Sequence, residues 1–304
     1  MALPLPLLLL IPNVVALLAA ATIADLSQPL AILTFFLSLL SGLIVGFSLG
    51  LIGGGGSIIA VPLLLYIVGM DDVHAAIGTS ALAVGVIAAI NAYAHKRKSN
   101  VNLKMGLMFA LPGAAGAYLG AQVGSITQGN HLLMLFAALM AAVAVKMMVD
   151  SKKEAPKHKN LQQDTGNNAN SIGRVLLHSL KGKRNHLSLT LPLGFAVGFA
   201  AGFFGIGGGF LIMPALLYST DLTMAQAIGT SLVSVSTFGF TSASSYLGTG
   251  QVDLFIAAIF VVGGGLGGIA GAKYSSRTKN QLLARIFALV LIAVALYVTY
   301  RGLA

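Results

Sequence analysis

The sequence predicts an all-α integral membrane protein of two inverted-topology repeats, each a glycine-broken re-entrant helical hairpin plus three transmembrane helices, with one extra N-terminal helix. Three observations predict this fold. Of the 304 residues, 57% are hydrophobic and only 9% are charged, whereas about 25% of the residues in a soluble protein are charged. Apolar stretches of membrane length recur along the chain, and the second part of the chain repeats the first.

Seven apolar stretches are long enough to cross a bilayer as a helix, which takes about 20 residues. The first has no basic residue before its apolar run, so we interpret it as a membrane helix. The alternative is a secretory signal that is cleaved after the small residues ending at Ala24. The seven stretches lie at roughly 3–23, 74–94, 105–125, 131–149, 226–246, 253–272 and 281–300.

Two further apolar stretches, 30–68 and 190–218, are interrupted by the glycine runs Gly53–Gly56 and Gly205–Gly209. An arm of about 12 residues, such as Ser57–Val68, rises about 18 Å, little more than half of a hydrocarbon core of roughly 30 Å. We therefore expect half-helices here, in stretches that enter the membrane and return on their own side.

The chain is an internal duplication. A shift of 152 residues lays Gly42–Pro62 over Gly194–Pro214 and matches the final proline and several glycines, among them Gly42, Gly46, Gly50 and Gly53. One residue is then lost in a loop, and a shift of 151 lays Ala75–Leu82 over Gln226–Val233, so that IGTS occurs in both. The predicted units are an N-terminal transmembrane helix at 1–28, repeat 1 at 29–150, a cytoplasmic basic linker at 151–189 and repeat 2 at 190–304.

The basic residues indicate membrane topology rather than nucleic-acid binding. The net charge is +10, but 15 of the 18 Lys and Arg residues fall in three loops, and basic loops tend to face the cytoplasm. Loop 95–104 has four of them, whereas the only charge in its equivalent, 246–255, is Asp253. The next loop reverses the bias, since 125–130 is uncharged and 273–280 has three basic residues. Equivalent loops are thus predicted on opposite sides. Parallel repeats, with each broken stretch as one full crossing, are the alternative.

The glycine breaks are the predicted binding site for an anion. Nonhelical backbone inside a membrane survives only against protein or a wet cavity, and glycine permits positive φ and close approach of a ligand to the peptide. Free N–H groups and the positive end of a helix dipole converge where the second arms begin, at Ser57 and Gly209. The hydroxyls of the IGTS sequences either donate to the same anion or bond back to a carbonyl one turn earlier. The predicted substrate-binding residues are Gly54, Gly55, Gly56, Ser57, Thr79, Ser80, Asn91, Gly207, Gly208, Gly209, Thr230, Ser231 and Ser234.

Glycines spaced by four residues are expected to pack helices together rather than to bind a ligand. They are Gly42, Gly46, Gly50, Gly116, Gly120, Gly267 and Gly271.

The sequence gives no sign of an enzyme. It has no cysteine, so thiolate metal sites and thiol nucleophiles are excluded. No Asp, Glu, Lys or Arg lies deep in a predicted span, and no phosphate-binding loop or nucleophile motif is found. We therefore predict no catalytic residue, no metal site and no cofactor.

The glycine pattern ending in proline occurs twice, each time followed by IGTS and later by GxxxGA. This doubled pattern resembles the TauE/SafE sulfite exporter family from Gly42 to Arg301. The resemblance implies a multi-pass transporter of sulfite, sulfonates or sulfoacetate in the prokaryotic inner membrane. We predict that it is a secondary transporter that exports these anions by alternating access. The predicted partners are a small anion, the lipid bilayer and, for coupling, protons or sodium, with no nucleic acid. A passive anion channel and a scaffold without transport are the alternatives; the oligomeric state is left open.

Overall fold

The computed structural model describes residues 29–97, 99–152, 186–209, 211–212, 215–216, 220, 222–274 and 292–298. Within these ranges every regular element is helical. The predicted N-terminal helix at 1–28 lies outside the described residues, as do most of the linker and most of the last predicted span.

The long helices coincide with the predicted apolar stretches, and local capping signals set several of their starts. The Asp72 side chain accepts from the His74 amide, Asn102 accepts from the Met105 amide, and Thr223 forms a capping box with Gln226. The long helices are α2 (Pro29–Ile52), α4 (Val73–Lys96), α5 (Leu103–Ile126), α6 (Gly129–Lys152), α8 (His186–Phe204), α10 (Met224–Gly248) and α11 (Leu254–Tyr274).

Several of these helices have the character of membrane spans. By length and composition, Ile32–Ile52, Val73–Lys96 and Leu254–Tyr274 are each able to cross a bilayer. The outer faces carry large apolar side chains that water would not tolerate in such number: Leu111 is 70% exposed and Ile126 is 83% exposed. The protein is therefore a multi-pass membrane protein whose outer faces contact lipid.

The first glycine break is helical and does not form an irregular loop. After α2 the chain continues as η1 (Gly53–Ile59), a 3₁₀ helix, then α3 (Ala60–Leu63) and η2 (Leu64–Val68). The arm expected to begin at Ser57 therefore begins at Gly53, and Gly69, with φ of 85°, ends it in the left-handed conformation typical of a helix end.

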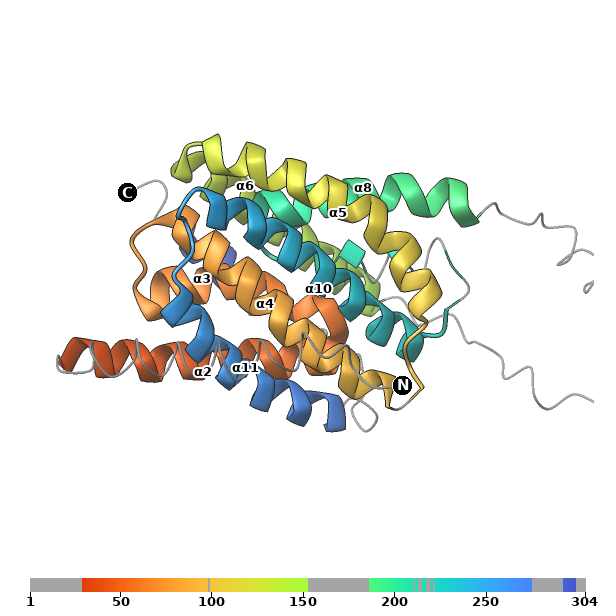
Figure 1. Cartoon of the computed structure of the whole chain (residues 1–304), viewed down its shortest axis with the longest axis horizontal. Coiled ribbons are helices and arrows are strands. Elements are labelled where there is room, and N and C mark those ends of the chain that lie inside the picture. Colours follow the sequence, from red (N-terminus) through yellow and green to blue (C-terminus); the bar gives the residue numbers. More distant parts are fainter. Residues whose placement is uncertain are drawn as a thin grey trace, which may run out of the picture.

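The two repeats are interlocked rather than laid side by side. In Figure 1, α4 and α10 lie together in the middle, α2 and α11 form one edge, and α5 and α8 form the other. The long helix that precedes each break therefore packs on a helix of the other repeat.

Spaced glycines hold together the two helix pairs formed between repeats, α2 with α11 and α5 with α8, which we call the exchanged pairs. A side chain on any of these glycines would collide with a backbone carbonyl of the partner helix. The numbers of the contacting residues increase together along both helices, so the paired helices run parallel. The prediction that spaced glycines pack helices is thus confirmed. Between α2 and α11 the contacts are Gly42 with Phe260, Gly46 with Gly264 and Gly50 with Gly268; between α8 and α5 they are Gly194 with Phe109, Gly198 with Gly113 and Gly202 with Ala117.

The central pair, α4 and α10, runs antiparallel. A Cβ at Gly85 would lie 3.2 Å from Gly239, while Gly78 lies against Gln251 at the far end of the pair. These two equivalent helices of the repeats therefore point in opposite directions.

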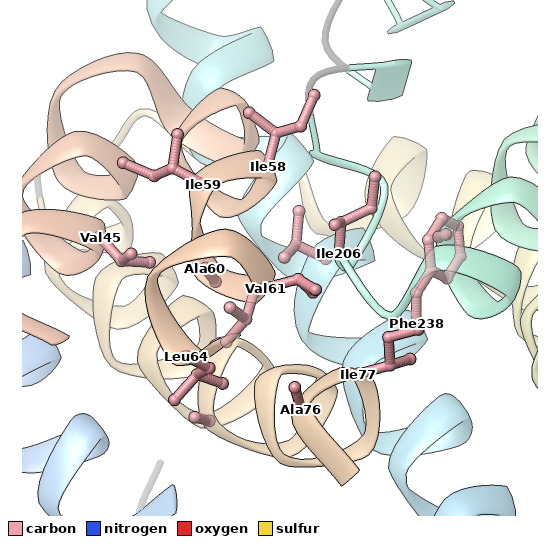
Figure 2. Close-up of a cluster of buried hydrophobic side chains, with 14 of the residues drawn as sticks. Val45, Ile58, Ile59, Ala60, Val61, Leu64, Ala76, Ile77, Ile206 and Phe238 are labelled. Atoms are coloured by element: carbon pink, nitrogen blue, oxygen red, sulfur yellow. The ribbon is translucent and has the colours of Figure 1, made fainter. Parts of the chain in front are cut away.

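One apolar core joins both repeats around the breaks. Figure 2 shows Val61 and Leu64, from the helical arm after the first break, together with Ile77 of α4, Phe238 of α10 and Ile206 of the second break. The breaks are thereby fixed in the middle of the protein by side chains from both halves.

Candidate anion site

The first break is closed by hydrogen bonds within the protein. Gly53 has φ of 76°, which ends α2 and which glycine adopts without strain. The Gly54 amide donates to Ser231 Oγ at 3.4 Å, and Ser57 Oγ donates to the Gly54 carbonyl at 2.8 Å. Gly55 lies within the same 3₁₀ helix. The Gly54 amide and the Ser57 hydroxyl of this break therefore have partners in the protein.

The second break has a more irregular backbone. Gly205, Gly207 and Gly208 each have φ of 63°, so the chain here is a series of turns. The Gly208 carbonyl accepts from the Leu211 amide at 3.0 Å and so begins the next helical turn. Among the hydrogen bonds of the described residues, none uses the amides of Gly207 or Gly208. Within the described part of the chain, two backbone donors of this break are thus without a partner.

The two breaks touch each other. A Cβ on Gly54 would collide with the backbone of Gly209, and one on Gly209 with that of Gly54. Beside them, a Cβ on Gly207 would lie 3.1 Å from Val84 of α4 and 2.9 Å from Val235 of α10. The prediction that the two breaks come together is confirmed by this contact, and only glycine allows the backbones to approach so closely.

Each break also lies against the IGTS turn of the other repeat. A Cβ at Gly53 would lie 3.1 Å from the Ile228 carbonyl oxygen and 3.0 Å from Ser231 Oγ, while Gly205 lies against the carbonyl of Ile77. Because Ile77 and Ile228 are equivalent residues, the two breaks rest on the same kind of surface.

The two predicted threonines join the repeats at helix starts. Thr79 Oγ1 accepts from the Asp253 amide at 2.8 Å, and Thr230 Oγ1 accepts from the Asn102 amide at 3.0 Å. Asp253 and Asn102 in turn accept from the first-turn amides of α11 and α5. Both hydroxyls therefore hold the helix start of the opposite repeat, instead of lying free beside the breaks.

The remaining predicted polar residues differ in their surroundings. Ser231 Oγ donates to the Ile228 carbonyl at 2.8 Å, and Ser234 Oγ donates to the Gly106 carbonyl at 3.3 Å. Ser80 Oγ and both polar atoms of the Asn91 side chain are buried without a hydrogen-bond partner. Asn91 lies against Gly268 of α11 rather than against a break.

Two of the buried, unpartnered hydroxyls outside the predicted set are equivalent residues of the repeats. Ser38 Oγ and Thr190 Oγ1 are buried without a partner in α2 and α8. The shift of 152 that aligns the glycines also aligns these two residues, so the repeat contained the signal.

The break residues and the IGTS hydroxyls carry no formal charge, so an anion here would meet only dipoles. Amides and hydroxyls are well suited to oxyanions because each donates along a fixed direction. Among the residues that the structure describes, no group of three or more His, Cys, Asp or Glu side chains is placed to hold a metal ion.

Comparisons with known proteins agree on one family. The family model described as sulfite exporter TauE/SafE matches residues 37–298. A probable membrane transporter protein of Xylella fastidiosa strain 9a5c is 43% identical over 264 residues, which make up 86% of this chain and 94% of the relative.

More distant relatives have the same description. The probable membrane transporter protein YunE of Bacillus subtilis is 27% identical over 279 residues, covering 89% of this chain and 99% of its own length. The probable membrane transporter protein MJ0441 of Methanocaldococcus jannaschii is 25% identical over 237 residues, with coverage of 72% and 80%. No solved structure matches the chain.

Proposed function

Since the chain belongs to the sulfite exporter TauE/SafE family of membrane transporters, we propose that it exports small sulfur-containing anions of the sulfite, sulfonate and sulfoacetate class. We place it in the inner membrane of a prokaryotic cell, as a secondary transporter coupled to protons or sodium. The observation that carries the proposal is the direct contact between two glycine breaks from opposite repeats, with amide donors left beside it.

The proposed anion site lies where the breaks meet. It combines the backbone of Gly54–Ser57 with that of Gly207–Gly209 and the hydroxyl of Ser80. Thr79, Thr230 and Ser231 are assigned to holding the protein together, because their hydroxyl oxygens already accept backbone N–H groups. Neutral donors favour release as well as binding, since an anion held by fixed cations would leave slowly.

The proposed topology is inverted. Antiparallel packing of the equivalent helices α4 and α10 supports it, together with the reversed charge bias of the equivalent loops. In the proposed hairpins, the arm before the break is long. The Gly50 carbonyl lies 3.1 Å from His95 Nε2 in the last turn of α4, so α2 reaches almost to the far end of that helix before the chain turns back.

Alternating access is proposed to move exchanged units rather than whole repeats. The contacts of α2 with α11 and of α5 with α8 are backbone against backbone, and sliding one repeat past the other would break both. The proposed moving bodies are α2 with α4 and α11, and α8 with α10 and α5. Their boundary is the α4–α10 contact and the two breaks, so rocking there opens the site to one side at a time.

Transport by the purified protein in liposomes tests the proposal. The measurement is uptake of ³⁵S-sulfite, sulfoacetate and methanesulfonate with imposed proton or sodium gradients. We expect saturable flux that shows counterflow when unlabelled anion is present on the far side. Flux that rises linearly and shows no counterflow would indicate a passive channel instead, and no flux in a well-inserted protein would indicate a scaffold.

A further inference from the structure

The two breaks differ in the hydrogen bonding of one serine, which occupies equivalent positions in the two repeats. Ser80 and Ser231 are equivalent residues of the two IGTS sequences, and both are completely buried. Ser231 Oγ donates to the Ile228 carbonyl and accepts from the Gly54 amide. Ser80 Oγ has neither partner. A buried hydroxyl without a hydrogen-bond partner is energetically unfavourable. The Ser80 hydroxyl therefore needs an explanation.

The repeat indicates which break Ser80 lies beside. Ser231 reaches the break because Gly53 rests on Ile228, and Gly205 rests on Ile77 in the same way. Ile77 and Val84 of α4 lie against Gly205 and Gly207, and Ser80 is three residues after Ile77 and four before Val84. Residues with this spacing share one helix face, so Ser80 lies on the face of α4 that contacts the second break, and its hydroxyl forms no hydrogen bond there.

The backbone of the second break is shaped differently from that of the first. In the first break, only Gly53 has a positive φ, and the chain is a 3₁₀ helix locked by Ser57. In the second break, Gly209 replaces that serine, and three glycines are left-handed. Successive amides in such a turn point into one concavity and form an anion-binding nest.

We propose that the two breaks are functionally unequal: the second, with the amides of Gly207 and Gly208 and the Ser80 hydroxyl, binds the oxyanion, whereas the first is a fixed structural support. This inference rests on the proposed function, because it assigns that site to one of its two halves. The unpartnered hydroxyl and the unbonded amides are then explained together, as donors kept for one ligand.

The donor set also selects the charge of the ligand. The break residues and Ser80 carry no formal charge, so the whole cost of removing the anion from water must be met by dipoles. The desolvation penalty rises steeply with charge, and an oxyanion group that carries two charges, as in sulfate, would need a cation that these residues do not supply. The site therefore favours monoanionic oxyanions, such as sulfonates and hydrogen sulfite, over the sulfate dianion.

The test uses equilibrium binding of methanesulfonate to the purified full chain, with sulfate as the competitor, for the wild type and two matched variants. We expect Ser80→Ala to raise the Kd for methanesulfonate about tenfold or more, the effect of losing one hydrogen bond to a charged group. Its melting temperature without ligand should stay the same or rise, because the deleted hydroxyl has no partner. Ser231→Ala should do the reverse, lowering the melting temperature while leaving the Kd within about twofold.

Three results would overturn the inference: an unchanged Kd in Ser80→Ala, an equal loss of affinity in both variants, or sulfate competing as well as methanesulfonate. Absence of methanesulfonate binding to the wild type would overturn it as well. Liposome flux judges the proposed function separately. Binding with the expected variant pattern but without flux would support the anion site and refute the transporter mechanism.

Discussion

Spaced glycines and consecutive glycines serve different purposes in this protein. The spaced ones, such as Gly46 and Gly198, lie on straight helices where the missing side chain lets two backbones touch. The consecutive ones, such as Gly207 and Gly208, also provide φ angles that other residues avoid. The first kind packs helices of the two repeats together, and the second shapes the breaks at which the two repeats also touch. Alanine substitutions separate the two roles.

The largest effect is expected at a spaced glycine in the middle of an exchanged pair. In Gly46→Ala the new methyl group would collide with the carbonyl of Gly264, so α2 and α11 must move apart along their length. We expect a loss of about 3 kcal/mol in the free energy of unfolding, at the upper end of overpacking penalties. Denaturant titration in detergent measures it.

The equivalent variant in the other pair, Gly198→Ala, should lose about as much stability. The control is Gly248→Ala, because nothing lies within 4 Å of a Cβ at that position. Equal stability of Gly46→Ala and Gly248→Ala would mean that the exchanged pairs do not hold the two repeats together.

A smaller effect on stability, with a larger one on binding, is expected at the second break. In Gly208→Ala the residue must keep φ of 63°, and its methyl group would lie 2.6 Å from Ala201 Cβ. The left-handed conformation alone costs about 1–2 kcal/mol. If this break binds the anion, the Kd for methanesulfonate should rise even where the variant is fully folded, so that lost stability does not account for the weaker binding. Calorimetric titration at a temperature where the variant is folded measures the Kd, and an unchanged value would place Gly208 with the packing glycines.

A third comparison concerns the hydroxyls that join the repeats. Thr79→Val leaves the Asp253 amide without its acceptor, and Thr230→Val does the same to Asn102. Each should lower the free energy of unfolding by about 1–3 kcal/mol, the range for an unsatisfied buried group. We expect no change in the Kd for methanesulfonate, measured by the same titration. Thr237→Val is the control, since that hydroxyl bonds only within its own helix, to the Val233 carbonyl.

The sequence was sufficient for the all-helical class and for the packing role of the spaced glycines, because each leaves a local pattern. The period of four in Gly42, Gly46 and Gly50 indicates a packing face whatever lies opposite. Which helix packs against that face depends on residues that are distant in the sequence. The pairing of helices between repeats could not be predicted, since the glycines of α11 could pack against any helix of suitable shape.

The same limit explains the outcome at IGTS. Thr79 and Ser80 are neighbours in one sequence motif, yet Thr79 Oγ1 accepts from a helix start of the other repeat, while Ser80 Oγ is buried without a partner. Successive residues of a helix point in directions about 100° apart, so they meet different neighbours. Which of the two faces a break depends on the packing of α4 against both repeats, and the motif alone does not specify it.

The smallest effect, and the most selective, is expected within one run of three glycines in α11. A Cβ on Gly263 would collide with the Leu39 carbonyl of α2, whereas a Cβ on Gly265 would meet only Ile90 Cδ1, at an ordinary 3.6 Å. Gly263→Ala should therefore destabilise the protein like the other spaced glycines, while Gly265→Ala should be neutral or stabilising by up to about 1 kcal/mol, the helix propensity difference. Denaturant titration of the two variants under identical conditions compares them. Equal losses at both positions would show that the run as a whole serves flexibility, because contact with α2 exists at only one of these two positions.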